Sequence, residues 1–576
     1  MYRPFKDYVF FLGFQLLNNA HGKSSNHTNT NTAHCTNNYT TDNTNERTTL
    51  FTNFGTSIYV GDKEIVRHSI MATPFEKLAQ SLEQLRKLQN EKGIAVVRAN
   101  VLSRTHKERL VANGFLQEVL KGWYISTRPD EKEGNTTSWY MSFWHFASVY
   151  LNARFSNDWC LSPEQSLSIH SGNSSVPNQL LIRSPKAQNN MIALLHGTSF
   201  FDLKLALPSE NERSEKDGIQ VYSLAAGLLA CAPDYFANNP TDARTCLSMV
   251  KDPSDILSLL LDGGHSVKAG RVAGAFRNIG SDRFADDIVR TMKSAGYDVR
   301  EDDPFQEKLS FVFGGRESSP YATRIRLMWH KMRPTVIEYF PSAPGLPVDK
   351  SNFLKQVDDL YVTDAYNSLS IEGYLVTTEL IERVRSGLWN PEDDENDENQ
   401  KDAMAARGYW QAFQAVKESI KDILDGKNPG EVADVGHSNW YRELFTPSVV
   451  AGILKASDLA GYRTNQVYIK GSKHIPLNKE AVRDAMPVLF DLLKEETEAS
   501  VRAVLGHFIF VYIHPYMDGN GRISRFMMNA MLASGGYKWT IIPVGQRNEY
   551  LSALEQASVD QDISGFAKFL AKLVKK

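Results

Sequence analysis

The chain has 576 residues, which is enough for about three or four domains of typical size. Apolar residues make up 42% and charged residues 23%, as in soluble globular proteins, and a net charge of −3 argues against binding driven by overall charge to nucleic acid or anionic membranes. The four cysteines, Cys35, Cys160, Cys231 and Cys246, show neither CxxC nor metal-ligand spacing, which argues against a disulfide framework or structural zinc and indicates a cytoplasmic protein.

The first seventy residues differ in composition from the rest of the chain. Between residues 18 and 53, 20 of 36 residues are Asn or Thr, a low-complexity tract that buries too little apolar surface to fold. The apolar run at residues 8–17 is too short to span a bilayer, so no membrane is expected as a partner. We interpret residues 1–70 as a disordered upstream extension and Met71 as the start of the protein, with a genuine tail or an export signal as the alternative.

Residues 71–135 are predicted to form two helices and a β-hairpin. Apolar residues recur at helical spacing over 74–90, and Ser103 is placed to cap a helix over 104–113. Apolar runs at 115–120 and 123–126 predict the hairpin. This order resembles the winged-helix module of abortive-infection antitoxins, and DNA is then an expected partner; a protein-interaction module with a solvated basic face is the alternative. The residues that could contact phosphates are Arg98, Arg104, Lys107, Arg109 and Lys121.

Residues 136–330 are expected to form an α+β region that carries no catalytic constellation. Strand-like runs occur at 180–182, 191–195 and 220–223, and a later helix is predicted over 281–296. The region resembles the second half of the same antitoxin-type proteins. We interpret Cys231 and Cys246 as packing residues.

Four prolines between residues 334 and 347 predict a linker over 331–351, because proline stops helices and favours extended chain. From residue 352 to residue 576 the pattern is mainly helical. One interruption, QVYIKGSKHIP at residues 466–476, alternates apolar and polar residues before a glycine and is predicted to form a β-hairpin.

The stretch HPYMDGNGRISR, which begins at residue 514, has the composition of an anion-binding turn. Gly519 and Gly521 free the backbone to point successive N–H groups at one spot, and the positive end of the following helix dipole reinforces that spot. Arg522 and Arg525 lie three residues apart on one helix face, where their planar guanidinium groups suit phosphate oxygens.

Two further residues of this stretch add catalytic chemistry. Asp518 offers the hard oxygen ligand that Mg²⁺ takes while it bridges phosphates. His514 titrates near neutrality and can accept a proton from an attacking hydroxyl.

The stretch resembles the Fic family signature, HPFx(D/E)GNGRxxR, with Tyr516 in place of the usual Phe. The resemblance implies that residues 352–576 are a Fic domain that transfers AMP from ATP to a Ser, Thr or Tyr hydroxyl of a protein. His514 would take the hydroxyl proton, and Asp518 would hold Mg²⁺. The residues implied in nucleotide binding are Gly519, Asn520, Gly521, Arg522, Arg525 and Tyr550, the last of them near the adenine.

Two other segments match this family. The sequence SLSIEG, from Ser368 to Gly373, resembles its inhibitory motif, (S/T)xxxE(G/N). The resemblance implies that Glu372 pairs with Arg525 and takes the guanidinium that the γ-phosphate of ATP needs, which makes the enzyme auto-inhibited. The hairpin expected at 466–476 resembles the flap that positions a target strand, and implies that role for Val467, Tyr468 and Ile469.

The expected fold is multidomain: a mainly α-helical Fic domain with a β-hairpin flap at the C-terminus, preceded by an α+β region and a winged-helix-like module. Removal of AMP, or transfer from another donor, is an alternative activity within the family. A DNA-binding regulator of the antitoxin kind is the alternative from a different class. The target protein is not predicted, and a homodimer is compatible with the sequence.

Overall fold

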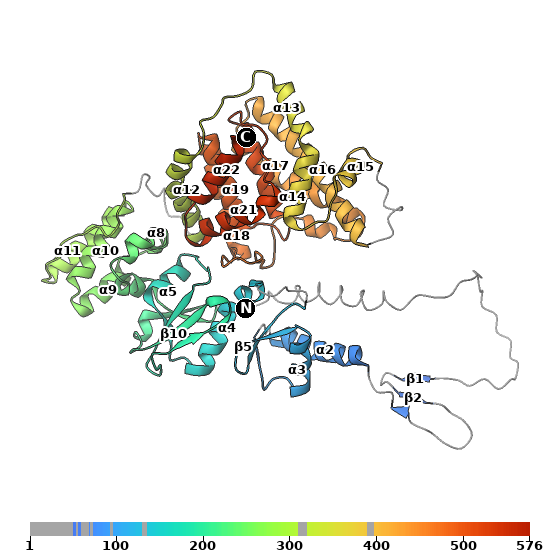
Figure 1. Cartoon of the computed structure of the whole chain (residues 1–576). Helices are drawn as coiled ribbons and strands as arrows, with labels where there is room; N and C mark the ends of the chain where they lie inside the picture. The colour runs from blue at the N-terminus through green and yellow to red at the C-terminus, as the bar shows by residue number, and fades with distance from the viewer. Residues whose placement is uncertain are drawn as a thin grey trace, which may run out of the picture. The chain divides into compact units, whose positions relative to one another are not determined.

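The computed structural model describes residues 50–52, 56–58, 68–69, 73–92, 96–129, 135–308, 319–388 and 397–575 (Figure 1). The chain divides into two compact units, Met1–Phe146 and Ala147–Lys576, with helix α4 (Thr137–Phe155) running from the first into the second. In the described part of the chain, none of the helices combines the length and the apolar character needed to cross a membrane.

The first unit contains the helices and the hairpin predicted for residues 71–135. Its helices are α2 (Pro74–Lys92) and α3 (Arg104–Ala112), and Ser103 caps α3 by accepting a hydrogen bond from the amide of His106. Strands β5 (Leu116–Leu120) and β6 (Trp123–Ser126) pair antiparallel, and β4 (Val96–Arg98) adds to β6, so the sheet order is β4-β6-β5. The resemblance to a winged helix stays a prediction.

Most of the extension expected to be disordered, residues 1–70, lies outside the described residues. Within it the structure describes three short antiparallel strands, β1 (Leu50–Thr52), β2 (Thr56–Ile58) and β3 (His68–Ser69), where disorder was expected. The strands contain Leu50, Phe51 and Ile58, which favour β-structure more than the Asn residues that are frequent over residues 18–53.

The second unit begins with the expected α+β region. Strands β8 (Gln179–Ser184) and β10 (Ser199–Lys204) pair in parallel, and β7 (Cys160–Leu161) and β9 (Met191–Ala193) flank them antiparallel, in the order β7-β8-β10-β9. A second, antiparallel pair consists of β11 (Arg213–Lys216) and β12 (Ile219–Tyr222). The helices of this region are α5 (Pro163–His170), α6 (Leu224–Ala230), α7 (Tyr235–Asn238), α8 (Pro240–Met249), α9 (Ser254–Gly263), α10 (Ser266–Asn278) and α11 (Asp282–Ser294).

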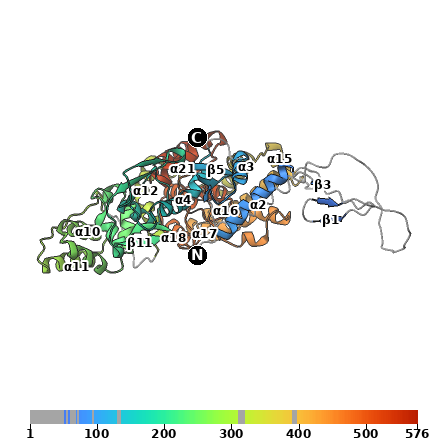
Figure 2. The same ribbon diagram turned by 90° about the horizontal axis from the view of Figure 1, so that it is seen from below.

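Helices α9, α10 and α11 pack side by side around a core that they share with α5, α6, α7 and α8 (Figures 1 and 2). Ile256, Val272 and Ile288, one from each of α9, α10 and α11, are buried there. Cys231 and Cys246 are buried in the same core, which confirms that they are packing residues, and burial raises the pKa of the Cys231 thiol to about 12.

The C-terminal part of the second unit is helical, as predicted, and buries the largest core of the chain. Its helices are α12 (Pro320–Tyr339), α13 (Lys350–Asp359), α14 (Tyr361–Glu372), α15 (Thr378–Arg385), α16 (Asp397–Leu424), α17 (Pro429–Val450), α18 (Lys479–Glu495), α19 (Ala499–Ile513), α20 (Asn520–Ala533), α21 (Arg547–Val559) and α22 (Ser564–Val574). The expected fold class is therefore confirmed in its mainly helical C-terminal part and its preceding α+β region.

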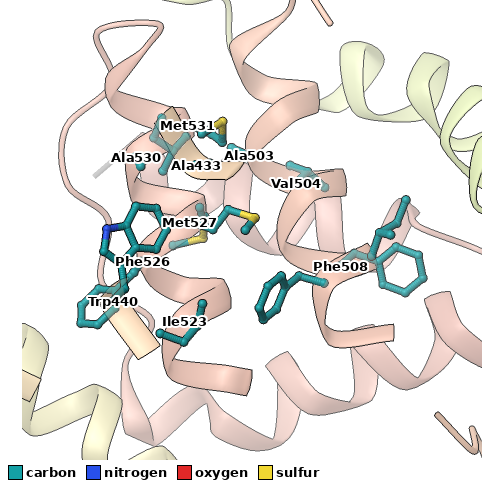
Figure 3. Close-up of a cluster of buried hydrophobic side chains, with 14 of the residues drawn as sticks. Ala433, Trp440, Ala503, Val504, Phe508, Ile523, Phe526, Met527, Ala530 and Met531 are labelled. Atoms are coloured by element: carbon teal, nitrogen blue, oxygen red, sulfur yellow. The ribbon is translucent and has the colours of Figure 1, made fainter. Parts of the chain in front are cut away.

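Helix α19 forms the centre of this core. Its sequence is apolar on all sides, as expected for a helix surrounded by others, and 14 of its 15 residues are buried. Figure 3 shows Ala503, Val504 and Phe508 of α19 among side chains of α20 and α17 such as Phe526 and Trp440. Because α19 and α20 are both packed in this way, the loop that connects them has fixed ends.

The linker predicted over residues 331–351 is shorter than expected, because α12 continues through Pro334 to Tyr339. Proline within a helix removes one backbone hydrogen bond and costs about 3 kcal/mol. Here α12 packs against α8, α18, α19 and α22, and this burial offsets the cost. The extended connection is confined to residues 340–349, where Tyr537 donates to the carbonyl of Pro341 at 2.6 Å.

Candidate functional site

The end of α19 places His514 in an unusual backbone conformation. His514 caps the helix with φ 56° and ψ 62°. This is a left-handed backbone conformation that is uncommon for residues other than glycine. Its amide donates to the carbonyl of Phe510 at 2.9 Å, and its own carbonyl accepts a hydrogen bond from Arg463 Nε at 2.7 Å. The backbone of His514 is thus held on both sides of its α-carbon.

The hydrogen bonds of His514 determine which ring nitrogen carries the proton. Nδ1 lies 3.1 Å from the carbonyl oxygen of Val511, which can only accept, so Nδ1 is the protonated nitrogen. Nε2 of the neutral ring then has a lone pair available for a proton. Burial lowers the pKa of His514 to about 4, so the imidazole is neutral at physiological pH.

The loop after His514 is braced by Asn520, the first residue of α20. Its Oδ1 accepts from the amide of Tyr516 at 2.9 Å, and its Nδ2 donates to the Tyr516 carbonyl at 2.8 Å. Gly519 has φ +80°, and a β-carbon there would lie 2.8 Å from Phe445 Cε2, so only glycine fits. The loop is fixed with its backbone at the N-terminus of α20, as expected for an anion site.

Arg522 is buried in the first turn of α20 with its hydrogen bonds incomplete. The residue is 1% exposed, and its Nη2 lies 3.3 Å from Asp518 Oδ2. Among the residues that the structure describes, Arg522 Nε and Nη2 have no hydrogen-bond partner. An unsatisfied buried donor costs about 1 to 3 kcal/mol, so this guanidinium is prepared for an anion that completes its bonding.

Arg525, one turn further along α20, is bound by two residues of α14. Its Nη2 lies 2.7 Å from Glu372 Oε1, its Nε donates to Ser368 Oγ at 2.8 Å, and Nη2 also donates to the Ser368 carbonyl at 3.0 Å. Burial lowers the pKa of Arg525, but the charge of Glu372 more than compensates and raises it, so the guanidinium stays protonated. The structure thus brings together the two segments whose pairing the sequence predicts.

The end of α14 positions Glu372 for this contact. Gly373 takes the left-handed C-cap conformation with φ +92°, and the amide of Tyr374 donates back to the carbonyl of Leu369 at 3.1 Å. A carboxylate at the C-terminus of a helix is disfavoured by the helix dipole. Arg525 supplies the opposite charge that holds it there, and a β-carbon at Gly521 would overlap with Glu372 Oε1.

Asp518 is the residue predicted to hold Mg²⁺. Its side chain is 65% exposed, and its Oδ1 accepts a hydrogen bond from the amide of Gly519 at 2.6 Å. Over the described ranges, no three His, Cys, Asp or Glu side chains are grouped to form a metal site. One exposed carboxylate beside an anion site fits Mg²⁺ that arrives with a nucleotide, because Mg²⁺ commonly takes one or two carboxylates and several phosphate or water oxygens.

Tyr550 on α21, which the sequence resemblance places near adenine, is 2% exposed. Its hydroxyl lies 2.8 Å from Nε2 of the buried His507, and its ring packs against Phe566 and Phe569. In this position Tyr550 supports the core beneath Arg525, and its contact with a nucleotide stays a prediction.

The segment predicted to be a β-hairpin flap is not one. The structure describes all of residues 466–476 and assigns no strand to them, only a turn at residues 470–471. Val467 is buried, and Tyr468 and Ile469 are half-buried. The target-positioning role of these three residues stays a prediction.

The backbone groups that would form the hairpin have other partners. Gln466 Nε2 donates to the carbonyl of Pro476 at 2.7 Å, and Glu555 Oε1 accepts from the amide of Lys473 at 2.8 Å. The Lys473 carbonyl accepts from the amide of Val176 in the α+β region at 2.9 Å. The bonds to Glu555 and Val176, which are distant in sequence, explain why the local alternation of apolar and polar residues predicted the wrong structure.

Sequence reasoning missed Arg463, which is buried and connects this segment to the loop of His514. Besides its bond to the His514 carbonyl, its amide donates to the carbonyl of Pro515 at 2.9 Å and its Nη2 donates to Leu477. Burial lowers the pKa of Arg463 to about 10. A lone arginine in an irregular segment has no periodicity or motif around it, so no local signal could have identified it.

The site lies in a part of the chain that is similar to known proteins. Residues 439–532 match the Fic/DOC family. Over 227 residues the chain is 31% identical to the proteins named protein adenylyltransferase Fic of Drosophila willistoni and Drosophila yakuba, a match that covers 38% of this chain and 41% of each relative. The chain therefore spans about two-fifths of the length of these curated relatives.

Two solved structures are similar to this chain as well. Fic-1 from C. elegans has 17% sequence identity and a TM-score of 0.33, over 56% of this chain and 89% of that chain. A Fic-domain-containing signaling protein from Bacteroides thetaiotaomicron VPI-5482 has 20% identity and a TM-score of 0.31, over 44% of this chain and 92% of that chain.

Proposed function

We propose that this chain, whose residues 439–532 match the Fic/DOC family, is a protein adenylyltransferase that transfers AMP from ATP to a Ser, Thr or Tyr hydroxyl of a protein. One observation carries the proposal. A neutral imidazole with an available Nε2 lone pair precedes a helix N-terminus at which a buried arginine lacks partners for two of its nitrogens. Proton acceptance and anion binding are the two requirements of nucleotidyl transfer to a hydroxyl.

His514 acts on the target, not on the nucleotide. Its Nε2 takes the proton of the target hydroxyl while the hydroxyl oxygen forms a bond to the α-phosphorus. The bond from that phosphorus to the bridging oxygen of the β-phosphate breaks, and pyrophosphate leaves. Because the pKa of His514 is about 4, the ring is neutral before the reaction begins and needs no prior deprotonation at pH 7.

The loop and the two arginines bind the phosphates. The amides at the start of α20 face the anion, Arg522 completes its hydrogen bonds on phosphate oxygens, and Arg525 stabilises the departing pyrophosphate once Glu372 releases it. Asp518 would hold Mg²⁺, which neutralises phosphate charge when bound. Catalysis of this kind rests on positioning and charge stabilisation.

The ion pair between Glu372 and Arg525 makes the described conformation auto-inhibited. A carboxylate 2.7 Å from Arg525 Nη2, with Ser368 on Nε, leaves this guanidinium unable to bind a γ-phosphate. The enzyme would become active when the end of α14 moves away from α20.

Intact-mass measurement after incubation with ATP and Mg²⁺ tests the proposal on three proteins: wild type, Glu372→Gly, and Glu372→Gly combined with His514→Ala. A gain of one AMP in the single variant that is lost with His514 would support it. Equal gain in the double variant would contradict the role of His514. If none of the three proteins gains mass with ATP but one gains mass with another nucleotide such as UTP, another donor is favoured.

Removal of AMP is the alternative direction for the same site. Glu372 would then activate water, so the Glu372→Gly variant should lose removal activity rather than gain transfer. Incubation of a protein that already carries AMP with wild type and Glu372→Gly distinguishes the two: release by wild type alone favours removal.

The predicted DNA-binding role of the first unit is a second candidate. Its α3 presents Arg104, 86% exposed, but this residue pairs with Glu108 at 2.7 Å, and Arg109 donates to Ser81 Oγ at 2.8 Å. These internal contacts reduce the number of cations available for phosphates. Affinity of the full chain for duplex DNA that does not fall with rising salt would remove this candidate. A homodimer stays a prediction.

A further inference from the structure

Arg522 lies between two aromatic rings. Its guanidinium carbon is 5.2 Å from the centre of the Tyr374 ring and 5.0 Å from the centre of the Phe445 ring. Both distances are within the range of a cation–π interaction. The rings therefore stabilise the positive charge of Arg522 at a position that is 1% exposed.

The rings satisfy the charge of Arg522 but not its hydrogen-bonding capacity. A guanidinium has five N–H donors in a planar fork, and aromatic faces accept none of them well. The nearest carboxylate, Asp518, is an exposed side chain that approaches only Nη2, at 3.3 Å. A ligand with several oxygens, such as pyrophosphate, would satisfy this fork better than the contacts that the structure shows.

The two rings come from different kinds of segment. Phe445 belongs to α17 and is buried in the main core, where it also contacts the position of Gly519. Tyr374 is half-buried and follows α14 directly, two residues after Glu372. The next residue, Leu375, is 81% exposed. Phe445 is thus part of the permanent site, and the position of Tyr374 depends on where α14 ends.

We infer that Tyr374 is a second inhibitory contact, which covers the guanidinium of Arg522 while Glu372 occupies that of Arg525. The inference rests on the proposed function, because it concerns regulation of the same phosphate site. Residues 372–374 then block both arginines with one short segment. Displacement of the end of α14 exposes both guanidinium groups together, and the ligand that gains access is the pyrophosphate portion of a nucleoside triphosphate.

A simpler role for Tyr374 would be to hold Arg522 in place for its ligand. The two roles predict opposite changes in anion affinity when the ring of Tyr374 is removed. Removal of a cover strengthens anion binding, whereas removal of a support weakens it. Inorganic pyrophosphate with Mg²⁺ is a suitable probe, because it needs the arginines but neither the adenine site nor a target protein.

The experiment measures pyrophosphate affinity by titration calorimetry on the full chain, for wild type, Tyr374→Ala, Tyr374→Phe and Glu372→Gly. Tyr374→Ala should bind about threefold to thirtyfold more tightly than wild type, the range of a partly buried cation–π contact. Tyr374→Phe keeps the ring but removes the hydroxyl that hydrogen-bonds Arg522, so its affinity should lie between those of wild type and Tyr374→Ala. Leu375→Ala is the matched control, because it changes the neighbouring exposed side chain.

Unchanged or weaker binding by Tyr374→Ala would overturn the inference. If Tyr374→Ala has a lowered melting temperature, the pyrophosphate affinity of Tyr374→Leu, which keeps apolar volume without the ring, is compared with wild type in its place. A different result would reject the proposed function alone. If Glu372→Gly and Tyr374→Ala bind pyrophosphate more tightly but neither transfers AMP, the inhibitory contact is supported and the adenylyltransferase activity is rejected. No binding to any variant would reject both.

Discussion

Arg463 Nε donates a hydrogen bond to the carbonyl oxygen of His514 at 2.7 Å, and this bond holds the one residue of the loop between α19 and α20 whose backbone is left-handed without being glycine. The other donors of the same guanidinium bind the carbonyls of Asn465 and Leu477. Arg463 thus connects the irregular segment 463–477 to His514, the proposed base.

Replacement of Arg463 by Met should reduce AMP transfer in the Glu372→Gly background by about tenfold to a hundredfold, because a misplacement of about 1 Å costs that much in rate. Initial rates at saturating ATP measure the effect. Arg483→Met, an exposed arginine on α18 whose Nη1 bonds only the backbone of its own helix turn, is the control. Unchanged turnover after Arg463→Met would show that His514 keeps its geometry without this bond.

The pH dependence of transfer should reflect the lowered pKa of His514. The base is the neutral imidazole, so activity is lost as pH falls through its pKa of about 4 and is independent of this residue above about pH 5.5. Transfer rates of Glu372→Gly, measured between pH 5 and pH 8, should therefore not fall steeply toward the acid end of this range. A half-maximal rate near pH 6.5, the ordinary value for histidine, would show that burial does not depress this pKa. Circular dichroism at each pH controls for unfolding.

Arg324 of α12 should be essential for the stability of the second unit. It is buried, pairs with the buried Asp242 of α8, and donates from Nε to the hydroxyl of Tyr512 on α19 at 2.9 Å. Arg324→Met leaves the Asp242 charge buried without its cation, at a cost of about 3 to 5 kcal/mol in the free energy of unfolding. Denaturant unfolding of the variant measures this cost.

A double-mutant comparison tests the pair itself. Asp242→Asn combined with Arg324→Met should destabilise the chain less than the sum of the two single variants, because the second change removes the charge that the first leaves uncompensated. Additive effects would mean that the ion pair does not couple the two helices.

Asp364 of α14 should make the chain less stable as pH rises. It is 5% exposed and accepts from the Tyr409 hydroxyl at 2.6 Å. Burial raises its pKa to about 6, with Tyr409, Trp539 and Arg525 acting in the opposite direction. The unfolded chain loses this proton near pH 4, so between about pH 4 and pH 6 the folded state holds more protons and the free energy of unfolding falls as pH increases.

Asp364→Asn removes the charge and keeps an oxygen for Tyr409. The variant should be more stable than wild type at pH 8, by at most about 3 kcal/mol, and should lose the dependence on pH between 4 and 6. Melting temperatures at pH 5 and pH 8 measure both effects, with the exposed Asp359→Asn as control. A lower melting temperature of Asp364→Asn at pH 8 would show that the ionised carboxylate is stabilising.

Local chemistry explains what could be predicted from the sequence. The turn from His514 to Arg525 is determined by its own residues, since glycines, the helix N-terminus and Asn520 fix one another over a short span. Its pairing with Glu372 is distant in sequence and was predicted from the resemblance alone. Ser103, the cap of α3, was identified because a cap depends on three neighbouring residues.

The features that were missed depend on contacts between distant segments. Pro334 stays within a helix because four other helices pack against α12. Residues 466–476 do not pair as a hairpin because Glu555 and the amide of Val176 take backbone groups of the returning arm. Tyr374 reaches Arg522 only because Glu372 brings the end of α14 to α20. None of these contacts leaves a periodic or local signal.

The ion pair between Glu372 and Arg525 has a thermodynamic consequence under the proposed function. The carboxylate and the γ-phosphate would compete for one guanidinium, so the inhibited state and the productively loaded state would exclude each other. Inhibition is then an equilibrium that the concentration of nucleotide shifts, with a free-energy change that grows as the logarithm of nucleotide concentration over its dissociation constant. The degree of inhibition is therefore not a fixed property of the chain but depends on the nucleotide concentration.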